Sequence, residues 1–553
     1  MRQTILSVVL DVEPQSARLL SGLLERFKRD QEPPGAKESY GRLKEEVPAL
    51  HFMSMSVFES ANYDPIFVIE VNFDGPPGPF WAQMEAALAD DLRPMLRCCK
   101  RPDDGDGPAH DAVTKPLSRY PLAPYLEKTT RPPSVFHQGN RGLERDRILC
   151  EGALFLATRD ALAQRSPTDP NPYRGIPAEE IHQKLRAELL GKFPWLATPA
   201  PARISWLERA VDLGQLLLFA LLALFCLSIP GMVVAPLAPP WRFLVLLALA
   251  TGVVAFLLWR IRAPRAGEGV PTRSGGLTAA SLSTKNDVTS LANPWTLSVA
   301  VGLFLAFYFV IVSSLGVIVA LLLTGLGFEG ALGLTVKVVG LGLLSVAFTA
   351  PAVVLWLRLL ERSDPSQDAP PVDEHLLGEM ARREDWIPQN HMGSVVLVKP
   401  GMLRMALFRA GHRGLGLVLR VVATDGYLGS MRTVHFAHWA FVNNRSRLMF
   451  FSNFDLSWES YLDDFIEKAH GGLTLAWGSG VGFPPTRFLV LDGASHGRKF
   501  KAWARHSMAV SRFWYSAYKD FTVDQIERNA RIANGLRKAT LNPEEATVWA
   551  RDL

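Results

Sequence analysis

The chain has 553 residues and a hydrophobic content of 48%, which together indicate more than one domain and favour membrane segments over a single soluble unit. The formal net charge of +5 is small for this length and no long basic run occurs, so nucleic acid is excluded as a typical partner. Four cysteines without C-x-x-C spacing exclude a disulfide framework and a structural zinc site, and they are typical of reduced thiols in the cytosol.

The N-terminal region predicts a strand, a helix, a hairpin of two strands and a second helix. Residues 3–12 form an apolar run, and residues 15–30 carry apolar side chains at helical spacing. Residues 51–59 and 66–74 are strand-like runs separated by a turn that contains Asn, Asp and Pro. Residues 79–92 then predict the second helix.

Four long apolar segments follow, and each predicts a membrane-spanning helix. They cover residues 213–234, 241–259, 295–324 and 333–357. Each holds at least about 17–20 mostly apolar residues, which is enough for a helix to cross the hydrocarbon core. Short turns join the first segment to the second and the third to the fourth, so we expect two membrane hairpins with the lipid bilayer as a partner.

Basic residues predict how these hairpins are oriented. The central loop and the outer flanks carry most of the nearby positive charge, at Arg203, Arg209, Arg260, Arg262, Arg265, Arg273, Lys285, Arg358 and Arg362. Positive charge favours the cytoplasmic side of a membrane. We therefore predict a multi-pass protein of the inner (cytoplasmic) membrane in which both soluble regions are cytoplasmic.

The C-terminal region repeats the order of elements predicted for the N-terminal region. Residues 391–399 predict a strand and residues 402–422 a helix. Residues 433–442 and 447–455 predict a hairpin, and residues 457–470 predict the second helix.

One more strand would complete each unit in the ferredoxin-like order β-α-β-β-α-β. In the C-terminal region, either residues 486–493 or residues 511–518 are expected to supply it. Extra helices are predicted at residues 178–191 and 522–538.

Three short sequences recur in the same order in the two regions and indicate an internal duplication. Ser-Val-Val-Leu, His-Phe and Asn-Phe-Asp occur at residues 7–10, 51–52 and 72–74, and again at residues 394–397, 435–436 and 453–455. We therefore predict an α+β fold in which two ferredoxin-like repeats flank a four-helix transmembrane region. The two repeats are expected to pair with each other within the chain.

The expected organisation has five segments. Residues 1–200 form the first ferredoxin-like domain, residues 210–260 the first transmembrane hairpin and residues 261–294 a flexible cytoplasmic loop. Residues 295–358 form the second hairpin and residues 375–553 the second ferredoxin-like domain.

Tandem ferredoxin-like units with such hairpins resemble the dimeric α/β-barrel superfamily. That superfamily includes dye-decolourising peroxidases, chlorite-dismutase-like haem proteins and small non-haem members. The resemblance covers the order of elements outside the membrane and implies a haem- or peroxide-linked oxidoreductase. The glycine–aspartate loop of the dye-decolourising peroxidases is not matched clearly, because only the pair Asp74-Gly75 is shared and the second copy has Asp455-Leu456. The pattern also resembles an uncharacterised bacterial family of four-helix membrane proteins.

The repeated histidine, asparagine and aspartate residues are the candidate catalytic residues, namely His51, Asn72, Asp74, His435, Asn453 and Asp455. Strand alternation predicts that His435 shares a face with Ala437 and Trp439. A carboxylate beside an imidazole can fix its tautomer for ligating a metal or haem, or for transferring a proton to peroxide. The alternative is structural, because an aspartate after a strand commonly caps a helix or shapes a turn.

Two functional hypotheses follow. The first is a membrane-anchored, peroxidase-like oxidoreductase that acts on an apolar or membrane-derived small molecule, with haem as a possible cofactor near His435 or His391. The second is a non-catalytic, membrane-tethered module for ligand binding or scaffolding. No metal ligands are predicted beyond a haem axial ligand.

Overall fold

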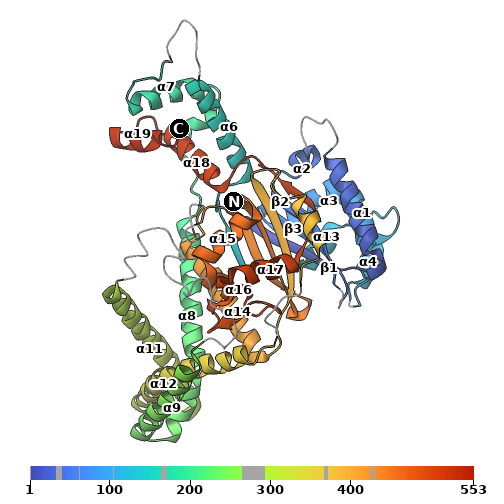
Figure 1. The fold of residues 1–553 in the computed structure, drawn as a ribbon. Helices are drawn as coiled ribbons and strands as arrows, with labels where there is room; N and C mark the ends of the chain where they lie inside the picture. The colour runs from blue at the N-terminus through green and yellow to red at the C-terminus, as the bar shows by residue number, and fades with distance from the viewer. Residues whose placement is uncertain are drawn as a thin grey trace.

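The computed structural model describes residues 2–32, 40–60, 63–103, 105–163, 171–263, 293–365, 371–423, 426–428 and 431–553. Within these residues, two five-stranded antiparallel sheets form a mixed α/β body, and four long apolar helices extend from it (Figure 1). We call residues 2–205 the N-terminal half and residues 363–553 the C-terminal half. The flexible loop predicted at residues 261–294 falls almost entirely on residues 264–292, outside the described residues.

The first sheet has the strand order β12-β2-β3-β1-β4. Its strands are β1 (Gln3–Asp11), β2 (Leu50–Phe58), β3 (Ile66–Asp74), β4 (Thr130–Arg131) and β12 (Ser511–Ser516). β2 is buried along its whole length and β3 along all but its last residue, because both faces of this sheet are covered. Helices α1 (Ala17–Gln31) and α3 (Pro77–Leu96) contribute to the core on one face.

The second sheet has the corresponding order β11-β6-β8-β7-β5. Its strands are β5 (Val135–Gln138), β6 (Gln389–Leu397), β7 (Val434–Val442), β8 (Arg447–Asp455) and β11 (Met508–Ala509). Its outer face packs against α14 (Met402–Val422), α15 (Trp458–Lys468), α16 (His470–Trp477) and α17 (Gly497–Ser507). The strands and helices predicted for both halves are therefore confirmed, with ends that differ by a few residues.

The two halves exchange strands. The chain leaves the first sheet after β4 and enters the second sheet as β5, where His137 pairs with Ala437 of β7. It leaves the second sheet after β11 and enters the first sheet as β12, where Tyr515 pairs with Met53 of β2. The prediction of the last strand of the C-terminal unit is therefore wrong, because β11 completes the second sheet and residues 511–516 join the first sheet as β12.

The inner faces of the two sheets pack against each other, as in a sandwich. Phe58 and Val68 from the first sheet share one buried cluster with Val395, Ala440 and Phe451 from the second. The remaining candidate strand segment, residues 486–493, forms a short separate hairpin of β9 (Thr486–Arg487) and β10 (Leu491–Asp492).

A separate helical layer covers one end of the body (Figure 1). It consists of α6 (Arg145–Ala163), α7 (Ala178–Leu190), α18 (Val523–Arg537) and α19 (Pro543–Ala550). The shorter helices elsewhere are α2 (Gly41–Glu46), α4 (Gly107–Thr114), α5 (Ala123–Thr129) and α13 (Glu374–Ala381). Both predicted extra helices, at residues 178–191 and 522–538, lie in this end layer.

The four apolar helices are long and apolar enough to span a membrane, which confirms the four predicted segments. They are α8 (Trp206–Val234), α9 (Pro240–Ile261), α11 (Pro294–Thr324) and α12 (Phe328–Arg362). Only 6–22% of each apolar window is buried against protein. Because the remaining apolar surface has no protein cover, these helices indicate a membrane protein.

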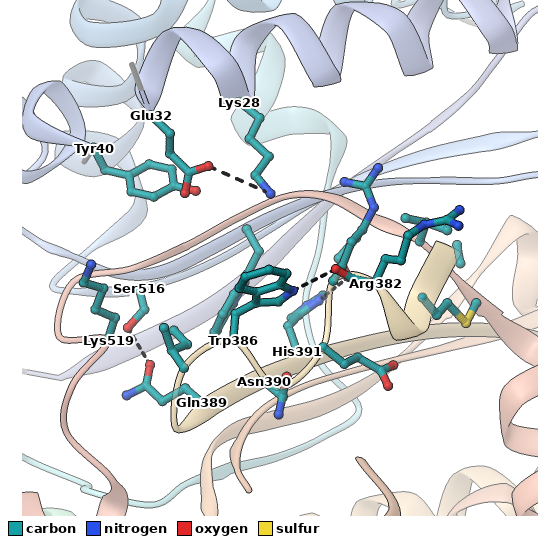
Figure 2. Close-up of a pocket in the computed structure, with 18 of the residues that line it drawn as sticks. Lys28, Glu32, Tyr40, Arg382, Trp386, Gln389, Asn390, His391, Ser516 and Lys519 are labelled. Atoms are coloured by element: carbon teal, nitrogen blue, oxygen red, sulfur yellow. Dashed lines mark hydrogen bonds and ion pairs between the residues drawn. The ribbon is translucent and has the colours of Figure 1, made fainter. Parts of the chain in front are cut away.

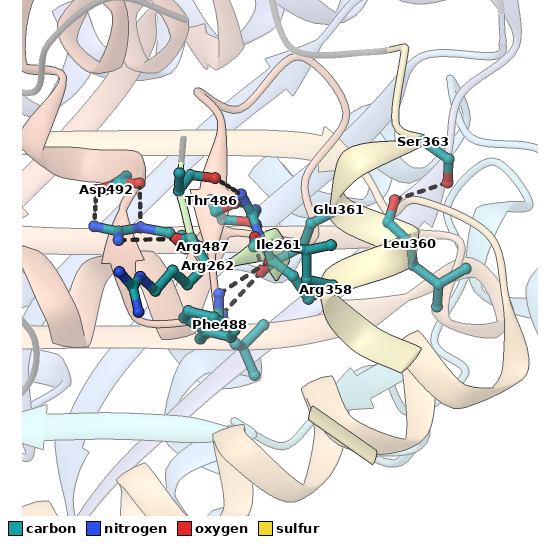
Figure 3. A network of polar contacts seen from close by, with 12 residues as sticks. Ile261, Arg262, Arg358, Leu360, Glu361, Ser363, Thr486, Arg487, Phe488 and Asp492 are labelled. Carbon is teal, nitrogen blue, oxygen red and sulfur yellow. Dashed lines mark hydrogen bonds and ion pairs between the residues drawn. The ribbon is translucent and has the colours of Figure 1, made fainter. Parts of the chain in front are cut away.

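Buried polar contacts join α12 and α9 to the C-terminal half (Figure 3). The Arg358 guanidinium donates to the carbonyl oxygens of Ile261 (3.2 Å) and Thr486 (3.0 Å). The Glu361 carboxylate accepts from the backbone N–H groups of Phe488 (2.9 Å) and Leu489 (2.8 Å). The last turn of α12 is thus tied to the β9–β10 hairpin.

The first turns of α8 are tied to both halves. Arg141 of the N-terminal half donates to Asp212 at 2.6 Å, and Arg420 of the C-terminal half lies 3.5 Å from the same carboxylate. Charged side chains therefore tie the membrane helices to the body at both junctions.

Candidate functional site

Two histidine–aspartate pairs occupy equivalent places in the two sheets. The Nε2 atom of His51 lies 3.0 Å from Oδ2 of Asp74, and Nε2 of His435 lies 2.8 Å from Oδ1 of Asp455. All four side chains are buried or nearly so. The imidazole–carboxylate pairing that the sequence suggested is therefore present in both halves.

Each aspartate also caps a helix. Asp74 accepts the backbone N–H of Arg145 at 2.8 Å, and Asp455 accepts that of Val523 at 2.7 Å. Arg145 and Val523 are the first residues of α6 and α18. The predicted structural role is thus present as well, although the capped helices are not the ones that directly follow the strands.

The predicted placement of His435 beside Ala437 and Trp439 is wrong. The strand register shifts between Leu50 and Phe52 in β2, and between Val434 and Phe436 in β7, so both histidines sit at β-bulges. A bulge turns the side chain toward the opposite face. The His435 ring consequently contacts Phe52 across the sheets, with 5.3 Å between centroids.

Tyr518 connects the two pairs. Its hydroxyl lies 2.9 Å from Nδ1 of His51, and its ring lies 5.9 Å from that of His435. Burial raises the pKa of Tyr518 well above its usual value, and the charges of Asp74 and Asp455 raise it further. The tyrosine therefore stays a neutral hydroxyl that packs between the two imidazoles.

Sequence reasoning missed the polar centre between the sheets, which is Glu70 of β3. This carboxylate is fully buried and accepts hydrogen bonds from four side chains. Oε1 accepts from the amides of Asn72 (2.8 Å) and Asn453 (3.1 Å). Oε2 accepts from Ser54 (2.9 Å) and pairs with Nε2 of His391 (3.2 Å). The available signal was a glutamate inside the otherwise apolar run 66–71.

The protonation of this centre follows from its contacts. Burial raises the pKa of Glu70, but the hydrogen bonds from His391 and Asn72 and the electrostatic interaction with the His391 and His438 rings outweigh that effect and lower it to about 2. Burial lowers the pKa of His438 to about 4, although Glu70 opposes this shift. At neutral pH, Glu70 is therefore an anion and His438, which is hydrogen-bonded to Ser7 at 2.9 Å, is neutral.

His391 links this centre to a pocket of about 510 Å³ (Figure 2). Its Nδ1 atom lies 2.6 Å from the Oγ atom of Ser511, and both residues line the pocket. Figure 2 shows Lys28 and Tyr40 on one side of the pocket and Gln389 and His391 on the other.

The pocket walls combine aromatic, apolar and basic side chains. The aromatic and apolar ones are Tyr40, Met380, Trp386, Ile387, Met508, Ala509, Val510 and Trp514. Five cationic side chains face two carboxylates, the cations being Lys28, Lys44, Arg382, Arg383 and Lys519 and the acids Glu32 and Glu384. The residues come from both halves, so the pocket exists only in the assembled body.

The network at the pocket floor is not duplicated, unlike the histidine–aspartate pairs. When the two halves are aligned on their repeated Asn-Phe-Asp sequences, Glu70 corresponds to Phe451. His391 pairs with Asn453 across the strands, and Ile5 holds that place opposite Asn72. Shared architecture therefore accounts for the repeated pairs, but it does not account for Glu70 and His391.

The histidines predicted as cofactor ligands do not fit axial ligation of haem. Both ring nitrogens of His391 are engaged, by Ser511 and by Glu70. His435 is bonded to Asp455 through Nε2, and its ring is buried and does not line this pocket. Among the described residues, no three His, Cys, Asp or Glu side chains are arranged to hold a metal ion.

Comparisons with family models, with curated proteins and with solved structures give no match to this chain. The assignment of a function therefore depends on the geometry of the site.

Proposed function

We propose that the chain is a membrane-anchored protein of two paired ferredoxin-like repeats that binds a small anionic ligand with an aromatic or apolar body. The order β-α-β-β-α-β in each half supports the repeats. The exchanged strands β5 and β12 support their pairing. The single observation that carries the ligand proposal is the pocket beside His391, which combines aromatic walls with an excess of basic side chains.

The charge of the pocket supports an anionic ligand. The exposed groups Arg382 and Lys519 face the same space as Lys28 and Lys44. One of the two acids, Glu384, is already paired with Arg505 at 2.8 Å. The remaining positive potential favours a negatively charged ligand, while Trp386 and Trp514 offer flat apolar surface to its body.

The position of the pocket supports a ligand that arrives from water. The pocket lies beside α1 and α13, which Figure 1 shows well separated from α9, α11 and α12. A ligand that came directly from the lipid would have to pass around the body. The apolar, membrane-derived substrate and the haem-linked oxidoreductase that the resemblance implies stay predictions without support from this pocket.

The exchanged strands also bear on topology. Each sheet contains strands from both halves, which supports placing both halves on one side of the membrane. Together with the basic residues beside the membrane segments, this supports the cytoplasmic placement proposed from the sequence.

Titration of the full-length protein in lipid nanodiscs tests the ligand proposal. Naphthalene-2-sulfonate should bind more tightly than neutral naphthalene-2-sulfonamide in calorimetry, and its affinity should fall as salt is raised. Trp386→Ala removes one aromatic wall and should weaken binding by about threefold to tenfold. Trp206→Ala is the matched control, since Trp206 is similarly exposed but lies on α8 outside the pocket. Equal affinity for the two naphthalenes, or equal effects of the two variants, would overturn the proposal.

A further inference from the structure

Three side chains at the pocket floor are connected by successive hydrogen bonds, and the last of them faces the pocket. Ser511 Oγ lies 2.6 Å from Nδ1 of His391, and Nε2 of His391 lies 3.2 Å from Oε2 of Glu70. Ser511 is half-buried and lines the pocket, whereas Glu70 is fully enclosed. A hydroxyl on an imidazole that is itself oriented by a carboxylate is the arrangement that activates a serine nucleophile.

The proton positions suit that role. The side chains of Ser54, Asn72 and Asn453 all donate to Glu70, so the carboxylate is held as an acceptor. It therefore accepts a hydrogen bond from Nε2–H of His391, and the lone pair of Nδ1 faces the Ser511 hydroxyl.

The imidazole is also held in place by its neighbours. The Trp514 ring stacks on one side of His391 at 6.2 Å and 27°, and Phe451 packs at 5.8 Å and 32°. Trp514 is fixed in turn by its indole N–H, which donates to Asn453 at 2.8 Å. A base whose orientation is set by its surroundings loses little entropy when it acts.

We infer that Ser511, His391 and Glu70 form a catalytic triad that hydrolyses a carboxylic ester bearing an anionic group. This inference rests on the ligand pocket proposed above and names the reaction performed there. The basic side chains Arg382 and Lys519 would hold the anionic group, and the ester carbonyl would lie over Ser511.

The reaction needs only water as a second substrate. Ser511 Oγ forms a bond to the ester carbonyl carbon while its proton passes to Nδ1 of His391. The bond to the alcohol oxygen then breaks, and the leaving alkoxide takes that proton. Water next attacks the acyl-serine and gives a proton to His391. The carboxylic acid leaves as Ser511 regains its proton, so ester and water become acid and alcohol.

Two other serines lie near this triad, but neither has the contacts and the exposure of Ser511. Ser7 and His438 are hydrogen-bonded at 2.9 Å beside the same Glu70, but both have 0% exposure. The Nδ1 atom of His438 lies 3.9 Å from the carboxylate. That pair cannot reach a substrate. Ser516 lines the same pocket as Ser511, but its hydroxyl bonds Gln389 at 2.7 Å instead of an imidazole.

A fluorophosphonate probe tests the triad on the full-length protein in nanodiscs. It should label Ser511, with the labelled peptide identified by mass spectrometry. Ser511→Ala should abolish labelling, and His391→Ala should slow it by about 100-fold or more, because the general base is lost. Ser118→Ala is the matched control and should be labelled at the wild-type rate, because Ser118 is also half-buried but lies outside the pocket.

Hydrolysis is tested with two esters of similar length. The wild type should cleave 4-nitrophenyl succinate, which carries a carboxylate, with a higher kcat/KM than neutral 4-nitrophenyl butyrate. Ser511→Ala should lose about 1,000-fold or more of this activity. Absence of labelling on Ser511, or equal ester turnover by the wild type and Ser511→Ala, would overturn the inference.

Binding of naphthalene-2-sulfonate separates the two proposals. If Ser511→Ala binds the sulfonate as the wild type does, its loss of labelling reports on the nucleophile and not on folding. If the wild type binds the sulfonate but is not labelled, the triad fails and the ligand site stands. If Ser511 is labelled but the sulfonate does not bind, the nucleophile stands and the anionic ligand proposal fails.

Discussion

Replacing Glu70 tests whether the charged centre between the sheets holds the body together. Glu70→Leu removes every acceptor from this buried position and leaves four donors without a partner, on Ser54, Asn72, Asn453 and His391. Each unsatisfied buried donor costs about 1–3 kcal/mol, so the loss is about 4–12 kcal/mol. Since whole domains are stable by only about 5–15 kcal/mol, we expect Glu70→Leu to fold poorly.

Glu70→Gln should be far milder. The glutamine keeps the shape and one acceptor oxygen, and its amide can donate to Ser54 and to His391 once the imidazole proton moves from Nε2 to Nδ1. The cost is then limited to the lost charge assistance, about 1–3 kcal/mol. The same proton shift turns Nδ1 into a donor toward Ser511, so this variant should stay folded yet lose labelling by the fluorophosphonate.

Thermal unfolding of the nanodisc-embedded protein, followed by near-ultraviolet circular dichroism of the packed aromatic rings, measures both variants. Glu45→Leu is the matched control, because Glu45 is exposed on α2. We expect the control to melt with the wild type, Glu70→Gln to melt somewhat lower, and Glu70→Leu to show little packed structure at any temperature. A melting temperature for Glu70→Leu within about 2 °C of the control would refute the reasoning, because the four donors would then have found other partners.

Three further predictions concern pH, the membrane junction and topology. Burial lowers the pKa of His137 to about 3 and of His412 and His438 to about 4. The unfolded chain therefore binds more protons than the folded chain, and the free energy of unfolding should decrease as pH falls from about 6.5 toward 4. His412→Gln should make this decrease with pH less steep in acid titrations. An unchanged pH dependence would contradict the lowered pKa of His412. Arg358→Ala removes the cation that lies 3.3 Å from the buried carboxylate of Glu361 and should cost about 3–5 kcal/mol locally. Hydrogen exchange of the backbone amides should become faster in this variant at residues 486–492, which form the β9–β10 hairpin, and should stay unchanged at residues 523–537 of α18. Unchanged exchange at residues 486–492 would contradict the role of Arg358 in tying α12 to that hairpin. A protease added outside intact cells should leave both halves uncut, and cleavage within residues 400–550 would overturn the proposed topology.

The sequence alone was sufficient for local structure. Four runs of about twenty apolar residues have few alternatives to membrane-spanning helices, because no other element of that length buries so much apolar surface. Residues 402–422 were predicted as a helix and are one, since apolar spacing reports directly on a helix face. The repeated His-Phe and Asn-Phe-Asp sequences located the central hairpin of each half, because they mark the start of its first strand and the end of its second strand.

Only the tertiary structure decided how these elements meet. The one-residue bulge at His435 reversed the predicted face of that side chain, and strand periodicity carries no signal for a bulge. The exchange of β5 and β12 depends on which sheet edge lies nearest when the halves pack. Ser511, His391 and Glu70 are far apart in the chain and come from three strands in two sheets. Their hydrogen bonds exist because two inner faces pack together, and a pattern that reports one face at a time cannot show what lies opposite it.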